Sequence, residues 1–508
     1  MTTLAQQARH RGLLTVCIML ATIMQALDTT IANVALPYMQ GSLSATIDQI
    51  SWVLTSYIVA AAIMTPVTGF LAERFGRKRL FLVSVVGFTV ASVLCGLATS
   101  LPEMVMFRLL QGVFGAPLVP LSQSVLLDSY PKERHGSAMA MWGMGVMVGP
   151  ILGPTLGGWL TEAYNWRWVF YINVPIGIAT FLGLSAYLSE SAEAKPRFDW
   201  TGFLTLSISI GALQMMLDRG EQIDWFSSTE IVVEAVLAGL AFYLFLAHTL
   251  TVDKPFIDPH IFKDRNFAIG MAFIFIVGII LLASLALITP YLQNLMGYPV
   301  VDAGLVLAPR GIGTMVAMMI VGRLINRVDP RLLLGFGLVT TAAVLWEMTG
   351  FTPDVSEGTL IRTGVLQGMG LGFMFVPLST ITFSTLAPGF RTQATALYSL
   401  IRNIGSSIGI SIVIFLLTRN TQLMHAELAG HVTPFNDALH IGGAAQFWNP
   451  ATLAGRLALN GEVTRQASII AYVDDFKLMM IVALVALPLV LLLRKAGSAV
   501  PAEAAVME

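Results

Sequence analysis

The sequence is dominated by apolar segments that are long enough to cross a lipid bilayer. Crossing the hydrocarbon core takes about 20 consecutive, mostly apolar residues in a helix. Such segments follow one another along nearly all of the 508 residues, of which 56% are hydrophobic and 12% are charged. Soluble proteins carry about 25% charged residues. The sequence therefore predicts an all-α polytopic membrane protein and excludes a soluble fold.

Segments of this length predict fourteen transmembrane helices. They lie near residues 13–36, 49–71, 79–99, 103–127, 136–161, 166–188, 200–218, 229–248, 266–295, 301–326, 331–350, 359–386, 391–418 and 473–494. Residues 419–472, between the last two helices, are more polar, and we expect them to form a long external loop. The net charge of −1 gives no reason to expect nucleic-acid binding.

The distribution of Lys and Arg predicts the orientation in the membrane. Cytoplasmic loops carry an excess of these residues. If the N-terminus is cytoplasmic, most of the 29 Lys and Arg residues fall in cytoplasmic segments, with a dense group from Arg74 to Arg79. The first apolar segment continues past Asp28 without a prompt small-residue cleavage site, so we interpret it as a membrane helix and not a signal peptide. Both termini are then cytoplasmic.

Two short motifs recur at nearly one spacing along the chain. Residues 69–74 are echoed by residues 322–327, where Gly, Leu and Arg return at the same offsets. Leu-Gln-Gly at 110–112 returns at 366–368, each time followed by Val-Pro-Leu-Ser. Chance similarity between apolar sequences is the alternative, which the shared spacing disfavours.

The repeat predicts two bundles of six helices with two further helices inserted between them. The corresponding divisions are residues 1–190, residues 191–262 with the inserted helices, and residues 263–508 with the loop near 419–472. Transporters built from parallel repeats bind their substrate between the two halves near the midplane of the membrane. The chain is therefore expected to be a transporter and not an enzyme.

Two opposite charges fall inside predicted membrane helices at similar depth. Asp28 lies ~22 Å from the cytoplasmic start of the first helix, at ~1.5 Å per residue, and Arg108 lies near the outer end of the fourth. Charges in the hydrocarbon are costly and mark functional sites. An acid beside a base can bind a proton when it faces outside and release it when the base approaches. We interpret the pair as proton-coupling residues, with a static packing role as the alternative.

Four further polar residues are candidates for a substrate cavity. Arg310 and Arg402 lie inside helices of the second half, where each can bind an acidic or hydrogen-bonding substrate group or a backbone carbonyl. Asn33 and Gln123 are the candidates in the first half.

The loop between the second and third predicted helices combines glycines with charges. Gly69 and Gly76 allow close approach and a sharp turn. Glu73 and Arg74, with Arg77, are expected to lock the two halves together on the cytoplasmic side, so that breaking this contact forms part of alternating access. Positive charge that merely sets the topology is the alternative role.

The fifth predicted helix carries a stripe of small residues. Small residues let another helix approach closely, and prolines add kinks. We interpret the stripe as a sliding or rocking contact between the halves, with a static interface as the alternative. Its residues are Gly145, Gly149, Gly153, Pro154, Gly157 and Gly158.

These motifs together resemble the major facilitator superfamily over nearly the whole chain. Residues 69–77 resemble its signature inside loop, with Glu73 where that family usually has Asp. Residues 108–112 resemble its proton-coupling motif, and residues 145–158 resemble the helix-five motif of drug:proton antiporters. The resemblance implies the major facilitator fold and proton-driven export.

Other segments resemble a narrower group. Residues 27–37, 166–175 and 217–220 are similar to motifs of the fourteen-helix antiporters. Residues 418–420 and 434–436 are similar to the EmrB-type pumps, which work in Gram-negative inner membranes with a periplasmic adaptor and an outer-membrane channel. The resemblance implies an inner-membrane location and such partners for this chain.

The expected substrates are lipophilic drugs or other small toxic molecules. A specific metabolite, an acidic compound or a fatty acid is the alternative, and a receptor that transports nothing is a third hypothesis. The sequence holds no phosphate-binding loop of the GxxxxGK[ST] type, which argues against direct drive by ATP. It shows no motif that calls for a cofactor or a metal.

Overall fold

A computed structural model describes residues 11–190, 198–433, 447–449 and 451–494. Within these ranges the chain is helical, and no β-strand occurs. They contain 13 helices that are long and apolar enough to cross a membrane. One further span is a pair of helices, α4 (Trp52–Met64) and α5 (Val67–Phe75), bent by 59°. The prediction of fourteen transmembrane helices in an all-α fold is confirmed.

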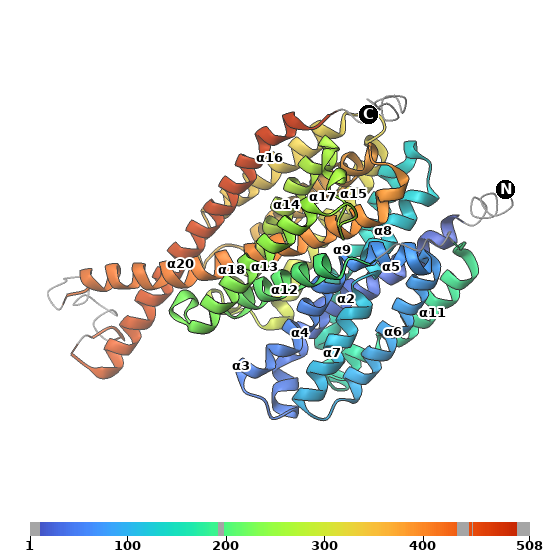
Figure 1. Cartoon of the computed structure of the whole chain (residues 1–508). Coiled ribbons are helices and arrows are strands. Elements are labelled where there is room, and N and C mark those ends of the chain that lie inside the picture. Colours follow the sequence, from blue (N-terminus) through green and yellow to red (C-terminus); the bar gives the residue numbers. More distant parts are fainter. Residues whose placement is uncertain (1–10, 191–197, 434–446, 450, 495–508) are drawn as a thin grey trace.

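The first six spans form one bundle, drawn in blue to green-blue in Figure 1. Two of them are broken beside a proline, at Pro66 and at Pro117, because proline cannot donate a backbone hydrogen bond. A short helix, α3 (Ile47–Ile50), follows the first span. The helices of the bundle are α2 (Arg11–Ser42), α4 with α5, α6 (Arg77–Leu97), α7 (Leu101–Gly115) with α8 (Leu118–Ser129), α9 (His135–Ala163), and α10 (Trp168–Tyr171) with α11 (Asn173–Tyr187).

The seventh and eighth spans are α12 (Trp200–Arg219) and α13 (Thr229–Thr251). They pack against each other, and α12 also contacts α4 and a helix of the second half, α18 (Arg391–His431). Asp199 caps the start of α12 by accepting a hydrogen bond from the Gly202 N–H at 3.0 Å. The pair therefore lies beside the junction of the two bundles (Figure 1).

The last six spans form the second bundle. It lies beside the first and is coloured from green to red in Figure 1. Its helices are α14 (Arg265–Pro290), continued by a π-helical turn (Tyr291–Leu295), α15 (Val300–Leu324), α16 (Pro330–Met348), α17 (Glu357–Ser384), α18, and α20 (Leu453–Ala486), continued by a 3₁₀ segment (Leu487–Leu492).

The two bundles repeat the same close helix contacts. In the first bundle α9 packs on α2, and a Cβ at Gly149 would lie 2.4 Å from the carbonyl oxygen of Ala26. In the second bundle α18 packs on α14, and a Cβ at Gly405 would lie 2.3 Å from the carbonyl oxygen of Phe275. Equivalent helices thus touch at equivalent glycines. The three divisions of the chain at 190 and 262 stay a prediction.

The expected long loop at residues 419–472 is wrong in its extent. The helix α18 continues to His431, and α20 already begins at Leu453, where the Thr452 side chain accepts a hydrogen bond from Gly455. Residues 434–446 and 450 lie outside the described residues. Hydropathy measures where a helix leaves the membrane, not where it ends, and these polar segments are rich in residues that favour helices in water. Both helices project beyond the bundle (Figure 1).

The molecule has two ends, a basic end and a projecting end. The basic end holds the turn between α5 and α6, where Gly76 has a φ of 79° and ends one helix while it begins the next. A residue with a side chain is strained at this φ, so glycine suits the turn. The projecting end is the opposite one, beyond which α18 and α20 extend (Figure 1).

Candidate functional site

Asp28 lies on α2 in the interior of the first bundle and is fully buried. Its Oδ2 accepts a hydrogen bond from Nη1 of Arg108 on α7 at 2.7 Å. Its Oδ1 accepts hydrogen bonds from Nε2 of Gln111 at 2.8 Å and from Nδ2 of Asn173, on α11, at 3.0 Å. The acceptor thus lies on α2 and its donors lie on α7 and α11, and both carboxylate oxygens accept hydrogen bonds.

Arg108 is also fully buried and is held on several sides. Its Nε donates to the carbonyl oxygen of Val53 at 3.0 Å, and its Nη1 donates a second bond to Oε1 of Gln111 at 2.7 Å. The guanidinium carbon lies 4.4 Å from the centre of the Tyr57 ring, within range of a cation–π contact. The buried positive charge therefore has a counter-ion, two neutral acceptors and an aromatic face.

Sequence reasoning named Asp28 and Arg108 for this site and included Gln111 in the motif at residues 108–112 without a separate role, but it did not assign Asn173 or Tyr57 to the site. Gln111 stands three residues after Arg108, so the helical repeat places the two side chains on one face, and this spacing was a usable signal. Asn173 and Tyr57 reach the site from distant segments, and their positions follow from helix packing alone.

This network suits a carboxylate that gains and loses a proton. While Asp28 is ionised, its charge and that of Arg108 cancel inside the protein. Protonation of Asp28 leaves the Arg108 charge without its counter-ion in a buried place, which costs several kcal/mol unless the surroundings change. Proton binding therefore favours a different arrangement of these helices.

The two bundles are joined by charge at the basic end, through one of the expected residues, Arg77, and two that were not expected, Asp128 and Arg391. Asp128, at the end of α8, forms ion pairs with Arg77 on α6 and with Arg391 at the start of α18. Glu73 and Arg74, which were expected to form the lock, take part in no ion pair within the described ranges. Of the predicted lock residues, Arg77 is the one that the structure brings to this contact.

Polar and close contacts surround this ion-pair cluster. The hydroxyl groups of Ser124 on α8 and Thr392 on α18 lie 3.0 Å apart, and both side chains are buried. Gly69 on α5 faces Gln393, since a Cβ at Gly69 would lie 3.2 Å from the Gln393 Cα. Ser137 on α9 donates to the carbonyl oxygen of Gly322 on α15 at 2.9 Å. The basic end of the interface between the bundles is thus closed.

The glycine stripe of α9 faces α2, within the first bundle. Beyond the contact of Gly149 with Ala26, a Cβ at Gly153 would lie 2.2 Å from the Thr30 Oγ1, and one at Gly157 would lie 2.9 Å from Ile31 Cγ1. The interpretation of the stripe as a contact between the halves is therefore wrong. A four-residue spacing marks a face that another helix approaches, but it does not say which helix.

The other members of the stripe belong to the same helix. A Cβ at Gly145 would lie 3.5 Å from the Met19 side chain of α2, an ordinary contact. Gly158 is buried, and Pro154 lies within α9. The contact of α9 with the second bundle uses other small residues, since a Cβ at Gly143 would lie 2.8 Å from the Met318 sulfur of α15.

The four candidate cavity residues lie apart from one another. Asn33 is exposed on α2 and donates to the carbonyl oxygen of Thr29 at 3.3 Å. Gln123 is fully buried beside Met139. Arg402, on α18, is half-buried, and its Nη2 lies 3.4 Å from the side-chain oxygen of Asn403. These three therefore do not form one site.

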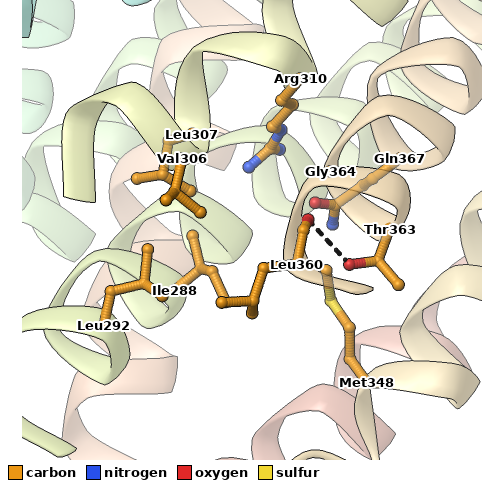
Figure 2. A pocket seen from close by; sticks show the side chains of 10 residues that line it. All are labelled: Ile288, Leu292, Val306, Leu307, Arg310, Met348, Leu360, Thr363, Gly364 and Gln367. Atoms are coloured by element: carbon orange, nitrogen blue, oxygen red, sulfur yellow. Dashed lines mark hydrogen bonds between the residues drawn. The ribbon is translucent and has the colours of Figure 1, made fainter. Parts of the chain in front are cut away.

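Arg310, on α15, faces a small pocket inside the second bundle (Figure 2). Its side chain is 8% exposed, and its Nη2 donates to the carbonyl oxygen of Leu281 at 3.3 Å. The pocket lies between α14, α15, α16 and α17. Its lining residues are Ile288, Leu292, Val306, Leu307, Arg310, Met348, Leu360, Thr363, Gly364 and Gln367.

A second buried carboxylate was missed by sequence reasoning. Asp475, on α20, is 1% exposed and forms no ion pair within the described ranges. It lies near the start of the predicted last helix, at residues 473–494, and no role was assigned to it from the sequence. The tyrosine rings of Tyr291 and Tyr472, centred 5.4 Å apart, flank this part of the bundle.

Comparison with known proteins identifies the family of this chain. The sequence profile of the Major Facilitator Superfamily matches residues 18–410. The chain belongs to the Major Facilitator Superfamily. It is accordingly a multi-pass membrane transporter of small molecules, and the family resemblance inferred from its motifs is confirmed.

Relatives in this superfamily include two characterised export and resistance proteins. The chain is 41% identical to the multidrug export protein EmrB of Escherichia coli over 427 residues, covering 84% of this chain and 83% of that protein. It is 38% identical to the fatty acid resistance protein FarB of Neisseria gonorrhoeae over 480 residues, covering 93% and 94%.

The fold of this superfamily member also matches solved structures. The proton:xylose symporter XylE aligns with a TM-score of 0.60 over 94% of this chain and 95% of its own, at 12% identity. The human organic anion transporter MFSD10 aligns with a TM-score of 0.57 over 93% of this chain and 99% of its own, also at 12% identity. At this level of identity the likeness concerns the fold.

Proposed function

We propose that this protein is a proton-coupled antiporter that exports lipophilic drugs or other small toxic molecules by alternating access. The observation that carries the proposal is the buried ion pair between Asp28 and Arg108, with Gln111 and Asn173 as further donors to the carboxylate. Binding of a proton to the Asp28 carboxylate is the simplest way to change the net charge of this site. The similarity to EmrB, a multidrug export protein, supports export as the direction.

In this mechanism Asp28 takes up a proton from the projecting end and loses it toward the basic end. Protonation frees Arg108 from its counter-ion, and the helices that hold the network, α2, α7 and α11, shift in response. The contact of Asp128 with Arg77 and Arg391 is the lock that must open on the basic side. When Asp28 releases its proton, the ion pair reforms and the closed interface returns.

The positive charge at the basic end supports a cytoplasmic location for that end and an external location for the projecting helices. We place the protein in the inner membrane of a Gram-negative bacterium, with both termini cytoplasmic. We propose that the projecting parts of α18 and α20 bind a periplasmic adaptor that leads to an outer-membrane channel, by analogy with EmrB-type pumps. An adaptor gene beside this gene would support that arrangement.

The experiment that tests the function is dye and drug export by proteoliposomes under an imposed pH gradient. Asp28→Asn is expected to abolish gradient-driven export. Asp475→Asn is the matched control, since it removes a buried carboxylate of the second bundle that has no arginine partner among the described residues, and we expect it to retain coupled export. Full export by the Asp28 variant would refute the assignment.

A fatty acid is the second candidate substrate, and the similarity to the fatty acid resistance protein FarB favours it. Growth of a pump-deficient host on a panel of cationic drugs and of long-chain acids would separate the two. Protection against the acids alone would make the fatty acid the substrate. Protection against the drugs alone would favour the first candidate.

A further inference from the structure

The second bundle contains a counterpart of the Asp28 site that lacks its carboxylate. The helices α15 and α17 pack as α4 and α7 do. A Cβ at Gly112 would lie 2.5 Å from the carbonyl oxygen of Tyr57, and a Cβ at Gly368 would lie 1.9 Å from that of Arg310. Arg310 therefore takes the place of Tyr57, and Gln367, just before the glycine, takes the place of Gln111.

The acid of the first site has no counterpart. Asp28 stands two residues after Ala26, where α2 touches the glycine of α9. Two residues after Phe275, the equivalent point on α14, stands Val277, which is 1% exposed. The second bundle thus keeps a guanidinium and a glutamine amide but has an apolar side chain where the first has its carboxylate.

Two hydrogen-bond donors of this counterpart site have no acceptor among the described residues. Nη1 of Arg310 and Nε2 of Gln367 are buried and form no hydrogen bond within the described residues. The pocket contains no acidic side chain, and Arg310 takes part in no ion pair among the described residues. A buried charge without a counter-ion is expensive, and so is each unsatisfied donor. A bound anion would supply the missing counter-ion of Arg310 and an acceptor for both donors.

The pocket has a volume of about 10 Å³ here, room for about one water molecule, so it must widen to admit an anion, and its walls indicate what kind of anion suits it. Six apolar side chains line it: Ile288, Leu292, Val306, Leu307, Met348 and Leu360. The Thr363 hydroxyl is already committed to the carbonyl oxygen of Thr359 at 2.8 Å, so it is no donor for a ligand. Figure 2 shows the Arg310 guanidinium directed into this apolar space, with the Gln367 amide directed toward the same space from α17.

We propose that this pocket binds the carboxylate of a lipophilic monocarboxylic acid, which accepts hydrogen bonds from Arg310 and Gln367 while its hydrocarbon contacts the apolar walls. Guanidinium–carboxylate hydrogen bonds are charge-assisted and strong. The ligand's carboxylate replaces the one that Asp28 provides in the first bundle. The inference deepens the proposed export function by naming a substrate class, and it rests on that function for its role in transport.

Binding is tested on the purified full chain in lipid nanodiscs, with dodecanoate as the probe and dodecanol as the uncharged control. Titration calorimetry is expected to show binding of dodecanoate and at least tenfold weaker binding of dodecanol. Arg310→Gln should weaken dodecanoate binding at least tenfold. Arg331→Gln, the control, removes an arginine of the same bundle that lies outside the pocket, and should leave binding unchanged.

A second variant keeps Arg310 and blocks the site from within. A Cβ at Gly364 would lie 3.8 Å from the Arg310 Cβ, an ordinary contact, so the first atom of a side chain is accommodated there. Gly364→Asp supplies an internal carboxylate, and we expect it to abolish dodecanoate binding while the unliganded protein unfolds at the same or a higher temperature. This variant also carries the test if Arg310→Gln does not fold.

Three results would overturn the proposal: equal binding of dodecanol, wild-type binding by Arg310→Gln, or wild-type binding by Gly364→Asp. Failure of the proposed function gives a different pattern. A wild-type protein that binds dodecanoate but exports nothing under a pH gradient would refute proton-coupled export and support the binding site. Coupled export of a cationic dye without dodecanoate binding would do the reverse.

Discussion

Replacing Asp28 by Asn changes the charge of the site while nearly preserving its shape. The carboxylate accepts a hydrogen bond from Arg108 at 2.7 Å, and both side chains are fully buried. Removing one member of a buried pair costs about 3–5 kcal/mol, because the other charge is left uncompensated. The neutral acceptors of Arg108, the Gln111 amide and the Val53 carbonyl, remain. We therefore expect a loss of about 3 kcal/mol in the free energy of unfolding, at the lower end of this range.

The double variant Asp28→Asn with Arg108→Gln separates charge from packing. Each single change is expected to cost about 3 kcal/mol, since each leaves one buried charge alone. In the double variant neither charge remains, so its cost should be less than the sum of the two by about 2 kcal/mol or more. Chemical unfolding of the four purified proteins in mixed micelles gives all the free energies that this cycle needs.

Transport is measured on the same four proteins. The double variant is expected to recover stability without recovering proton uptake, because no titrating carboxylate has been restored. Additive costs, with a coupling below about 0.5 kcal/mol, would show that the two side chains do not stabilise each other. Substrate-driven proton uptake by the double variant at the wild-type level would refute Asp28 as the proton carrier.

Three other substitutions test separate parts of the structure. Asp128→Asn removes the carboxylate that pairs with Arg391, and should raise hydrogen–deuterium exchange at the start of α18 up to about tenfold. Part-exposed ion pairs contribute about 1 kcal/mol, and unchanged exchange would contradict the lock. Gly149→Ala should lower stability by about 1–3 kcal/mol in thermal unfolding through overpacking, whereas Gly145→Ala, with 3.5 Å of room, should be tolerated; equal effects would contradict the packing described. Asp199→Ala should cost about 1 kcal/mol by removing the cap of α12, measured by the same unfolding experiment, and no loss would show that the cap is not needed.

The number of membrane-spanning helices could be predicted from sequence because the thickness of the bilayer fixes the length of an apolar helix. The same rule placed Asp28 and Arg108 at one depth, since a helix rises by a constant amount per residue. The depth of a residue in the membrane depends on its distance along the helix axis, and the number of residues from the start of the helix gives this distance. The division into spans therefore needed no knowledge of how the helices pack.

Packing partners could not be predicted in the same way. The glycine stripe of α9 indicates close approach, but its partner proved to be α2 and not the second bundle. Asp128 and Arg391 come together from segments far apart in the sequence, and nothing in the local pattern of either joins them. Asn173 reaches Asp28 for the same reason. Each of these contacts depends on how helices are arranged around one another.

Helix ends were the other source of error. The predicted span ends near residue 418 because the side chains become polar there, yet the helix continues to His431. The hydropathy of a segment indicates whether it lies in lipid or in water. Capping residues and helix-breaking residues decide where the helix ends. Residues 419–431 are polar but contain no proline, and they form helix and not a loop.

The continuity of α18 has a mechanical consequence. Its 41 residues form one helix with a length of ~60 Å at ~1.5 Å per residue, about twice the thickness of the hydrocarbon core. It begins at Arg391, inside the ion-pair cluster at the basic end, and it ends beyond the opposite surface. A rigid rod of this kind moves at both ends together. A tilt of the second bundle is thus transmitted to the far side as a displacement of the tip, so an outside partner on that tip would be moved by the opening of the lock at the basic end.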